Sequence, residues 1–270
     1  MASQSTLLTA LQIASIFVAS YAYSARAFAQ NDQQEPPAAA LHGQTTFIWQ
    51  NKPGFGAPYS GPNSLRPQRE ESYSLTVTGD IGLRLWRGAQ LHLNPEGAQG
   101  NPLSNLTGAG GISNGELQRG SGASLSAYTA RLFLQQRFDA GGNLETVGPD
   151  FNELGGKFAA KRWTITLGTF SLLDYFDNNP YAKDPREQFM NWAFLTHGAW
   201  DYAADARGYT TGFVVEYRTP GWSVRAGRAM QPRESNGLAL DPSLGGQYGD
   251  QLELDGNLPI TLPAGRMRAR

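Results

Sequence analysis

The chain has 270 residues and no cysteine, and its 22 lysines and arginines nearly balance its 23 aspartates and glutamates, for a formal net charge of -1. This balance excludes the basic surface that duplex nucleic acid requires, and the lack of cysteine excludes disulfides and thiolate metal sites. Hydrophobic residues make up only 40% of the chain, and its 32 glycines indicate many tight turns. We therefore expect a protein of strands and loops with no nucleic-acid partner.

The first 29 residues have features of an export signal. Residues 7–23 form an apolar stretch, and the tripeptide AFA at residues 27–29 is the small-x-small pattern that signal peptidase cuts, here before Gln30. Residues 1–6 contain no lysine or arginine, so the usual positive segment is missing and a transmembrane anchor is the alternative. Because the apolar run is marginal for the ~20 residues that a spanning helix needs, we expect residues 1–29 to be a cleaved signal peptide.

Residues 30–43 are polar and rich in proline and alanine, which predicts a flexible lead-in to the folded part of the chain. Beyond them, apolar and polar residues alternate. In residues 73–86 (YSLTVTGDIGLRLW) the odd-numbered positions are almost all apolar and the even-numbered ones mostly polar, as in a strand whose two faces meet different surroundings. In a second such segment, strict alternation places Tyr128 on the same apolar face as Leu132. The alternation recurs at residues 91–96, 128–137, 162–167, 212–218, 222–227 and 251–254.

The connections between these segments are unequal in length. Residues 86–89 and 219–222 are tight turns, whereas residues 97–126 and 170–209 are long and rich in glycine, asparagine, serine and aromatic residues. Short turns at one end and long loops at the other are typical of an outer-membrane β-barrel. A soluble β-sandwich also alternates. The charges on the polar faces suit a water-filled lumen, and the few bulky residues on the apolar faces suit lipid as the neighbour, so the pattern favours the barrel.

The second long loop begins like a helix. Asp184 suits the N-cap, Pro185 the first helical position and Glu187 the third, which predicts a short helix to about Leu195. A helix in a barrel loop could fold inward and narrow the pore.

The same loop contains residues that suit other kinds of chemistry. His197, Asp201 and Asp205 follow one another at intervals of four, which would suit a metal site on a helix, but the glycines nearby make a continuous helix doubtful. Asp201 and Asp205 could also serve glycoside hydrolysis as paired carboxylates. Capping and salt bridges, for instance to Arg207, are more common roles for such residues, so we expect neither a metal nor a catalytic site. An outer-membrane enzyme acting on glycans or lipids remains the alternative.

Aromatic residues are the other notable feature of this loop. A flat ring beside polar groups can hold a sugar, and it can equally pack a loop onto the barrel wall. Both roles stay open for the four candidates, which are Trp192, Trp200, Tyr202 and Tyr209.

Several segments resemble the carbohydrate-selective (OprB-type) porin family of Gram-negative outer membranes. The segments are FIWQNKPGFGAPYSGPNSL (47–65), YSLTVTGDIGLRLW (73–86), NPEGAQGNPLSNLTGAGGISNGE (94–116), ARLFLQQRF (130–138), FDNNPYAKDPREQFMNWAFLTHGAWDYAADARGYTTG (176–212), VRAGRAMQPRESNGLALD (224–241) and YGDQLELD (248–255). The resemblance implies a barrel of about sixteen antiparallel strands that passes sugars by diffusion. It implies no catalysis, no cofactor and no energy coupling. The partners that it implies are small sugars, the lipid bilayer of the outer membrane and the outer-membrane assembly machinery.

Charged residues on the polar faces are expected to line the channel and to contact the solute. Donors and acceptors facing each other across a narrow lumen would bind hydroxyl groups, while the transverse field would disfavour apolar solutes. The alternation selects Arg84, Glu96, Arg131, Arg137, Glu216 and Arg225, of which Glu96 follows a proline and fits less well.

The chain ends at LPAGRMRAR, which looks like the start of another strand. The part after the expected signal peptide holds roughly eight to ten strands, well short of sixteen. We therefore expect residues 44–270 to form an incomplete antiparallel transmembrane β-barrel, about half of a porin, with a short helix in a long loop. A non-functional truncated remnant is a second alternative to a working porin.

Overall fold

The computed structural model describes residues 37–119, 122–196, 200–256, 258–262 and 265–269. Both the expected signal peptide, residues 1–29, and His197 lie outside the described residues. The main sheet is antiparallel throughout, and each of its eight strands pairs with the next one along it. In order, these strands are β1 (Ala39–Lys52), β2 (Glu70–Trp86), β3 (Ala89–Asn101), β4 (Ser126–Asp139), β7 (Arg162–Phe170), β8 (Thr210–Arg218), β9 (Trp222–Met230) and β10 (Tyr248–Gly256).

Shorter elements lie in the connections and after β10. Two small hairpins are formed by β5 (Leu144–Val147) with β6 (Gly156–Ala159) and by β11 (Leu258–Leu262) with β12 (Gly265–Ala269). The 3-10 helices of the described residues are η1 (Leu103–Leu106), η2 (Gly108–Gly111), η3 (Gly115–Arg119) and η4 (Leu172–Asp174). Among these residues, no helix is long and apolar enough to cross a membrane.

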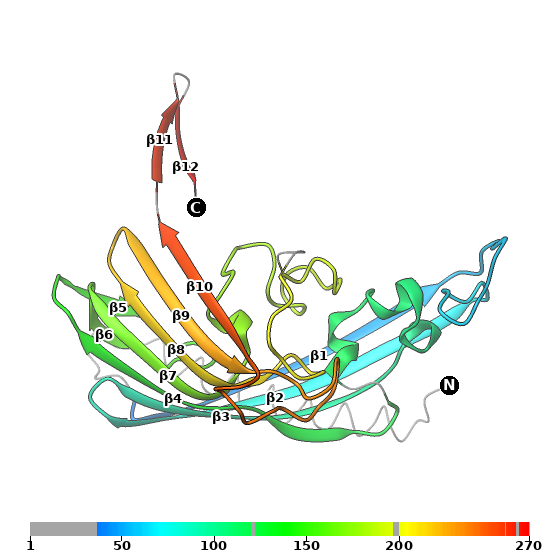
Figure 1. Ribbon diagram of the computed structural model, residues 1–270, viewed down its shortest axis with the longest axis horizontal. Coiled ribbons are helices and arrows are strands. Elements are labelled where there is room, and N and C mark those ends of the chain that lie inside the picture. The colour runs from blue at the N-terminus through cyan, green and yellow to red at the C-terminus, as the bar shows by residue number, and fades with distance from the viewer. Residues whose placement is uncertain (1–36, 120–121, 197–199, 257, 263–264, 270) are drawn as a thin grey trace.

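The main sheet curls into a trough, and the loop between β7 and β8 lies on its concave side, whereas the loop between β1 and β2 extends past the ends of the strands (Figure 1). Every segment that alternates in the sequence lies within one of its strands, so the expected antiparallel, porin-type partial barrel is confirmed. One boundary differs, because β1 starts at Ala39, inside the lead-in expected over residues 30–43. Ala39 pairs with Leu83 of β2, and the residues after Ala39 pair with β2 residues back toward Glu70. This pairing outweighs the low strand propensity of the first residues of β1.

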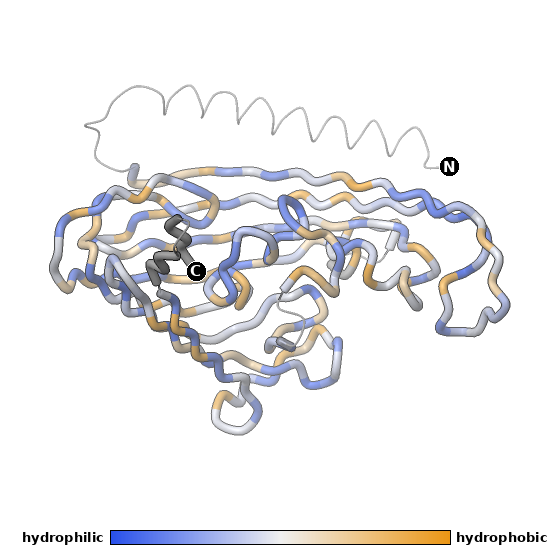
Figure 2. Tube along the Cα trace, turned by 90° about the horizontal axis from the view of Figure 1, so that it is seen from above, coloured by the Kyte–Doolittle hydropathy of each residue, from blue (hydrophilic) through white to orange (hydrophobic). Residues whose placement is uncertain are grey.

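Burial on the two faces of the sheet is the reverse of that in a soluble protein. On β2 and β3 the polar face is covered, and Thr78, Asp80 and His92 are each 0% exposed. The apolar face is open, and Leu132 and Leu167 are 47% and 50% exposed. Hydrophilic and hydrophobic residues follow one another along the long strands (Figure 2). A soluble sandwich would bury its apolar faces, whereas a barrel wall turns them toward lipid and keeps the polar face inside.

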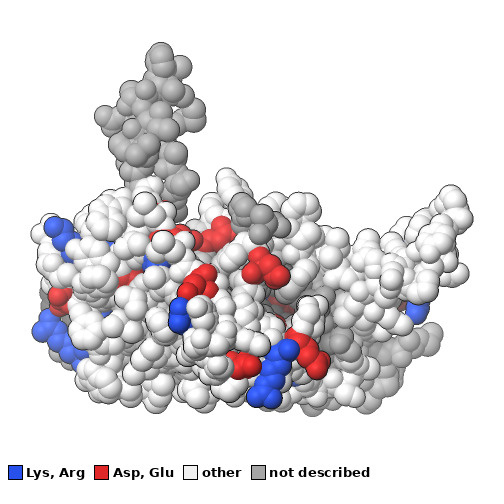
Figure 3. Space-filling model, viewed as in Figure 1, with Lys and Arg blue, Asp and Glu red and all other residues white. Residues whose placement is uncertain are grey.

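Acidic side chains lie mainly in the middle of the molecule, around the loops that fill the trough (Figure 3). Large aromatic residues gather on the opposite, outer face, where the strands approach the tight turns. Trp163, Tyr217 and Trp222 lie in a row there, with ring centroids 4.7 and 5.6 Å apart. Such rings are suited to the interface between hydrocarbon and headgroups.

Strand β4 departs from strict alternation. The pairing of β3 with β4 shifts between Asn94 and Pro95, which is the signature of a β-bulge. The shift turns Tyr128 to the inner face, where its hydroxyl donates to Glu96 at 2.5 Å. The outward position of Tyr128 that strict alternation predicts is therefore wrong, because the extra residue of a bulge exchanges the two faces.

The tight turns lie at one end of the strands and the long loops lie at the other end, except for one long connection at the end of the tight turns. The connection between β4 and β7, residues 140–161, starts at the end of the tight turns and contains the β5–β6 hairpin. This connection covers the inner face of β2–β4 at that end. Leu154 is 1% exposed and its backbone N–H donates to Gln90, while the N–H of Asn152 donates to Asp80 at 2.9 Å.

Candidate functional site

The loop between β7 and β8, residues 171–209, enters the trough (Figure 1). One side of it packs on the inner wall through an apolar cluster made by both the loop and the strands. This cluster consists of Phe133, Phe170, Leu172, Phe176, Ala203, Val214 and Ala229. Burying this patch on an otherwise polar inner face anchors the loop to the wall.

The helix η4 opens the loop and adds an ionic contact to this anchor. The hydroxyl of Ser171 accepts from the N–H of Leu173, and the N–H of Ser171 donates to Asp174, which together form a capping box. Capping orients Asp174 toward Arg131 of β4, whose Nε and Nη2 each donate to the carboxylate at 2.7 Å. This paired geometry is the strong form of a charge-assisted hydrogen bond.

Arg186 fixes the other side of the loop to the opposite part of the wall. Its guanidinium donates to Glu96 of β3 at 2.9 Å, to Glu116 of η3 at 3.0 Å and to Gln44 of β1 at 2.9 Å. The Arg186 side chain is 9% exposed, and both carboxylate side chains are 0% exposed. The loop therefore spans from the β7–β9 wall to the β1–β3 wall, with a buried arginine at its far side.

Glu96 is the centre of this contact. Besides Arg186, it accepts hydrogen bonds from the hydroxyls of Thr78 at 2.5 Å, Tyr128 at 2.5 Å and Tyr209 at 3.2 Å. A buried carboxylate needs such donors to offset its desolvation. Glu96 is 2% exposed, so it lies in the wall and holds Arg186 instead of facing the open lumen.

The helix predicted from Asp184 to Leu195 does not form, so this part of the expected fold is wrong. Asp184 does form a first turn. Its side chain accepts a hydrogen bond from the backbone N–H of Arg186 at 2.7 Å, and its backbone carbonyl accepts one from the N–H of Gln188 at 2.9 Å. Beyond this turn the backbone pairs with the β3–β4 loop. Met190 accepts from Gly115 and Trp192 donates to Ile112, both at 2.8 Å. These contacts use the groups that a helix would need.

A small cavity of about 100 Å³ lies between the loop and the inner wall. Charged groups from both sides surround it, and Lys183 is fixed by donating to Asn178 at 2.6 Å. The lining residues are Arg131, Ser171, Leu173, Asp174, Lys183, Asp184, Pro185 and Arg186. Donors and acceptors held this way can exchange hydrogen bonds with a polyhydroxylated solute.

The remaining residues predicted to line the channel all lie on the inner face, in two groups. Arg225 of β9 joins Glu216 of β8 to Glu253 of β10, and Glu253 also accepts from the N–H of Asp177 in the loop at 2.7 Å. Arg84 and Arg137 instead bind the β4–β7 connection. Arg84 donates to the carbonyl of Gly155 at 2.9 Å, and Arg137 makes a two-pronged contact with Glu153.

The contact between Glu153 and Arg137 predicts a pH dependence. Burial alone would raise the pKa of Glu153, but the bonds and charge of Arg137, together with the Gly155 N–H and Gln90, hold the pKa below its usual value of 4.5. The stabilisation is therefore fully present above pH 4.5 and is lost as the pH falls through the lowered folded-state value. We expect proteolytic nicking of residues 140–161 to increase in that acidic range.

The variant Glu153→Gln should be nicked faster already at pH 7 and respond less to acid. Glu145→Gln is the matched control, because Glu145 lies in the same hairpin and pairs with Arg162 through a longer contact of 3.3 Å, with a side chain 37% exposed. A wild-type nicking rate that does not change between pH 7 and pH 3 would contradict this role of Glu153.

The loop aromatics mostly pack. Tyr209 is 3% exposed and bonded to Glu96. Trp200 and Tyr202 pack against the apolar cluster, with their ring centroids 5.3 Å apart. Trp192, at 36% exposure, keeps the most open surface of the four predicted residues.

The carboxylates considered for metal binding or hydrolysis serve local structure or lie open. Asp205 accepts from the backbone N–H groups of Arg207 at 2.9 Å and Tyr209 at 3.0 Å, which closes a turn before β8. Asp201 is exposed. Within the described part of the chain, no group of three or more histidine, aspartate or glutamate side chains is placed to hold a metal ion.

Sequence reasoning missed Arg186, Glu116, Asp174 and Lys183 as functional candidates. None of them follows the alternation of a strand, because all lie in connections. The only signal was the DPRE motif around Arg186, which describes the local turn and says nothing about the distant partners of the guanidinium.

Comparison with models of known protein families identifies the family of this chain. The family described as carbohydrate-selective porin, OprB family, matches residues 74–258, which is more than half of the chain. The match includes β3, β4 and β7–β10, most of β2, and the loop that spans the trough. No curated protein and no solved structure matches.

Proposed function

Because the chain belongs to the carbohydrate-selective porin, OprB family, we propose that it passes glucose-like sugars by passive diffusion across the outer membrane, between the loop of residues 171–209 and the inner wall. The proposal includes export by a signal peptide at residues 1–29 and a barrel domain that begins with β1 at Ala39, inside the lead-in expected over residues 30–43. It also includes insertion by the outer-membrane assembly machinery.

The observation that carries this proposal is the charged loop held across a trough whose polar face is inside. Arg131 and Asp174, which pair with each other, line the small cavity together with Lys183 and Asp184, so donors and acceptors are both available to a solute. A solute with many hydroxyls can replace its lost hydration with bonds to these groups, while an apolar solute cannot. Arg186 and Glu96 keep the loop in place.

The residues that the alternation predicts to contact the solute are all kept in the proposal, but their proposed roles differ. Arg131, Glu216 and Arg225 are proposed to act in the lumen itself. Arg84 and Arg137 act by holding the β4–β7 connection against the wall, and Glu96 acts by holding Arg186. Of the loop aromatics, Trp192 is the one proposed to meet sugar directly.

No specific observation favours the enzymatic alternative. A hydrolase would need two carboxylates free to exchange protons with a substrate, and Asp205 is engaged by two backbone donors. Passive diffusion through a channel requires no catalytic group, no cofactor and no energy source, and we propose this passive role for the chain.

Swelling of proteoliposomes tests the proposal. Liposomes containing the protein are expected to swell faster in glucose than in an amino acid of similar size, such as glutamine. Removing the Arg131–Asp174 pair in the double variant Arg131→Ala/Asp174→Ala should reduce this difference. Equal wild-type rates for glucose and glutamine would remove the selectivity from the proposal.

A further inference from the structure

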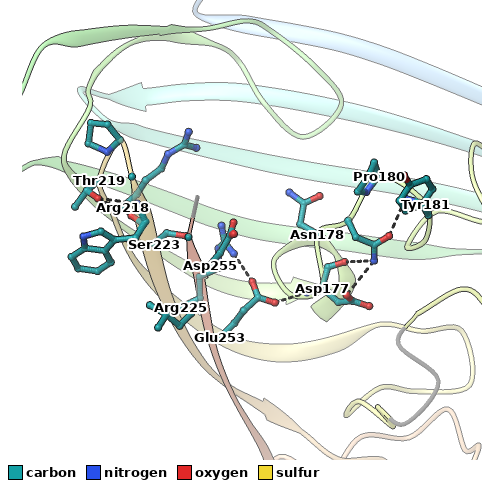
Figure 4. A pocket seen from close by; sticks show the side chains of 16 residues that line it. Asp177, Asn178, Pro180, Tyr181, Arg218, Thr219, Ser223, Arg225, Glu253 and Asp255 are labelled. Atoms are coloured by element: carbon teal, nitrogen blue, oxygen red, sulfur yellow. Dashed lines mark hydrogen bonds and ion pairs between the residues drawn. The ribbon is translucent and has the colours of Figure 1, made fainter. Parts of the chain in front are cut away.

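A second and larger pocket lies on the other side of the loop, toward the tight turns. It has a volume of about 700 Å³ and is formed by residues 177–181 of the loop together with the ends of β8, β9 and β10 and the turn at residues 218–223. Figure 4 shows Asn178 of the loop toward Arg218, Arg225 and Asp255 of the strand side, and Tyr181 farther along the loop at the other end of the pocket. This volume is in the range of about 300–1,000 Å³ that is usual for ligand pockets.

The polar groups of the pocket are held in place before any ligand arrives. Arg225 is fixed between Glu216 and Glu253, and the carboxylate of Glu253 is tied to the loop by the N–H of Asp177. On the loop, the amide of Asn179 donates to Asp177 at 3.1 Å and accepts from the N–H of Tyr181 at 2.9 Å. Preorganised donors and acceptors lower the entropy cost of binding.

The lining combines an open aromatic ring with groups that bond hydroxyls. Tyr181 is 71% exposed, and Asn178 uses its amide oxygen for Lys183. Amide N–H groups donate to hydroxyls, carboxylates accept from them, and an aromatic face packs on the C–H face of a sugar ring. Three carboxylates (Asp177, Glu253, Asp255) outnumber the two arginines (Arg218, Arg225) in the lining. The excess negative charge disfavours anionic ligands.

We propose that this pocket is a saccharide-binding site separate from the passage beside Arg186, and that it holds neutral disaccharides in preference to their acidic forms. This inference rests on the proposed function, because it adds a second binding site for the solute along the same permeation path. In it, Tyr181 is the stacking surface, Asn178 and Glu253 bond the hydroxyls, and Asp255 provides the discrimination against anions.

Direct binding measurements test the site. Calorimetric titration of the full chain in detergent micelles with maltose is expected to show saturable binding. The variant Tyr181→Ala should weaken this binding by about 3- to 10-fold, because it removes the aromatic face. Asn178→Ala tests a second contact without relying on the first. Both residues are exposed, so neither change removes a buried contact of the fold.

The charge effect has its own comparison. Maltobionate, the acidic counterpart of maltose, is expected to bind the wild type more weakly than maltose does. Asp255→Asn should raise the affinity for maltobionate by about 3- to 5-fold, and it should change the affinity for maltose by less than about twofold. Asp250→Asn is the matched control on the same strand, because Asp250 pairs with Arg228 and lies outside the pocket. Asp250→Asn should change the affinity for neither maltose nor maltobionate.

The outcomes separate this site from the proposed function. The site is overturned if wild-type protein shows no saturable maltose binding, or if neither Tyr181→Ala nor Asn178→Ala weakens it; preferential swelling in glucose would then leave the porin function standing. Conversely, maltose binding that these variants weaken supports the site even if wild-type liposomes do not take up sugar. The lack of uptake would then count against the proposed function alone.

Discussion

Replacing Arg186 with alanine is expected to open the passage and to raise single-channel conductance several-fold, with loss of the preference for sugars over amino acids of similar size. The change removes the guanidinium that joins the loop to Glu96, Glu116 and Gln44. It also breaks the ion pairs of Arg186 with two fully covered carboxylates, and breaking a buried ion pair costs about 3–5 kcal/mol. The far side of the loop can recover this free energy only by leaving the wall and letting water reach them.

Two further variants control this result. Arg87→Ala removes an arginine whose side chain is 94% exposed at a tight turn, and it should leave conductance unchanged. Arg186→Lys keeps the charge but replaces the three nitrogens of the planar guanidinium, each of which reaches a different partner, with one compact ammonium nitrogen. An intermediate conductance is therefore expected. If Arg186→Ala forms channels with wild-type conductance and selectivity, the contact does not hold the loop.

The second large effect concerns the outer face. Leu167 lies near the middle of β7 and is 50% exposed on the apolar side of the sheet. Leu167→Arg is expected to lower the free energy of folding into bilayers by about 2–4 kcal/mol, because the charge must stay in hydrocarbon. The measurement is a urea titration of folding into lipid vesicles, with the folded fraction read from the gel shift of folded barrels.

A charge on the opposite face of the same strand is the matched comparison. Thr164 lies on the inner face of β7, directly opposite Glu216 on β8. Thr164→Arg should change the folding free energy by much less, since an arginine there has water and a carboxylate beside it. Equal costs for the two variants would show that the two faces do not meet different solvents.

Much of the wall could be predicted because the signal is local. A period of two within one segment already fixes which residues share a face, and it identified seven of the eight strands of the main sheet among the described residues. The sequence of β1, AALHGQTTFIWQNK, does not predict a strand as clearly, because Gly43 and Thr45 stand between Leu41 and Phe47 on the outer face and weaken the alternation. Tyr128 was placed on the wrong face because a bulge depends on the partner strand, which one segment does not reveal.

The candidate site was harder to predict because its contacts join distant parts of the chain. Arg186 reaches Glu96 across 90 residues and Gln44 across 142. The motif around Asp184 correctly predicts a turn, but only the pairing of Met190 and Trp192 with the β3–β4 loop explains why no helix follows. Local propensity yields to such contacts when they use the same backbone groups.

Spin labels at Leu83 and Arg84 test most directly whether the apolar face meets lipid and the polar face meets water. These neighbours on β2 belong to opposite faces, and Leu83 is 41% exposed on the outer one. In the protein refolded into vesicles, the label at residue 83 is expected to be accessible to oxygen and shielded from a nickel chelate. The label at residue 84 should show the reverse, and equal accessibilities at both positions would contradict the arrangement.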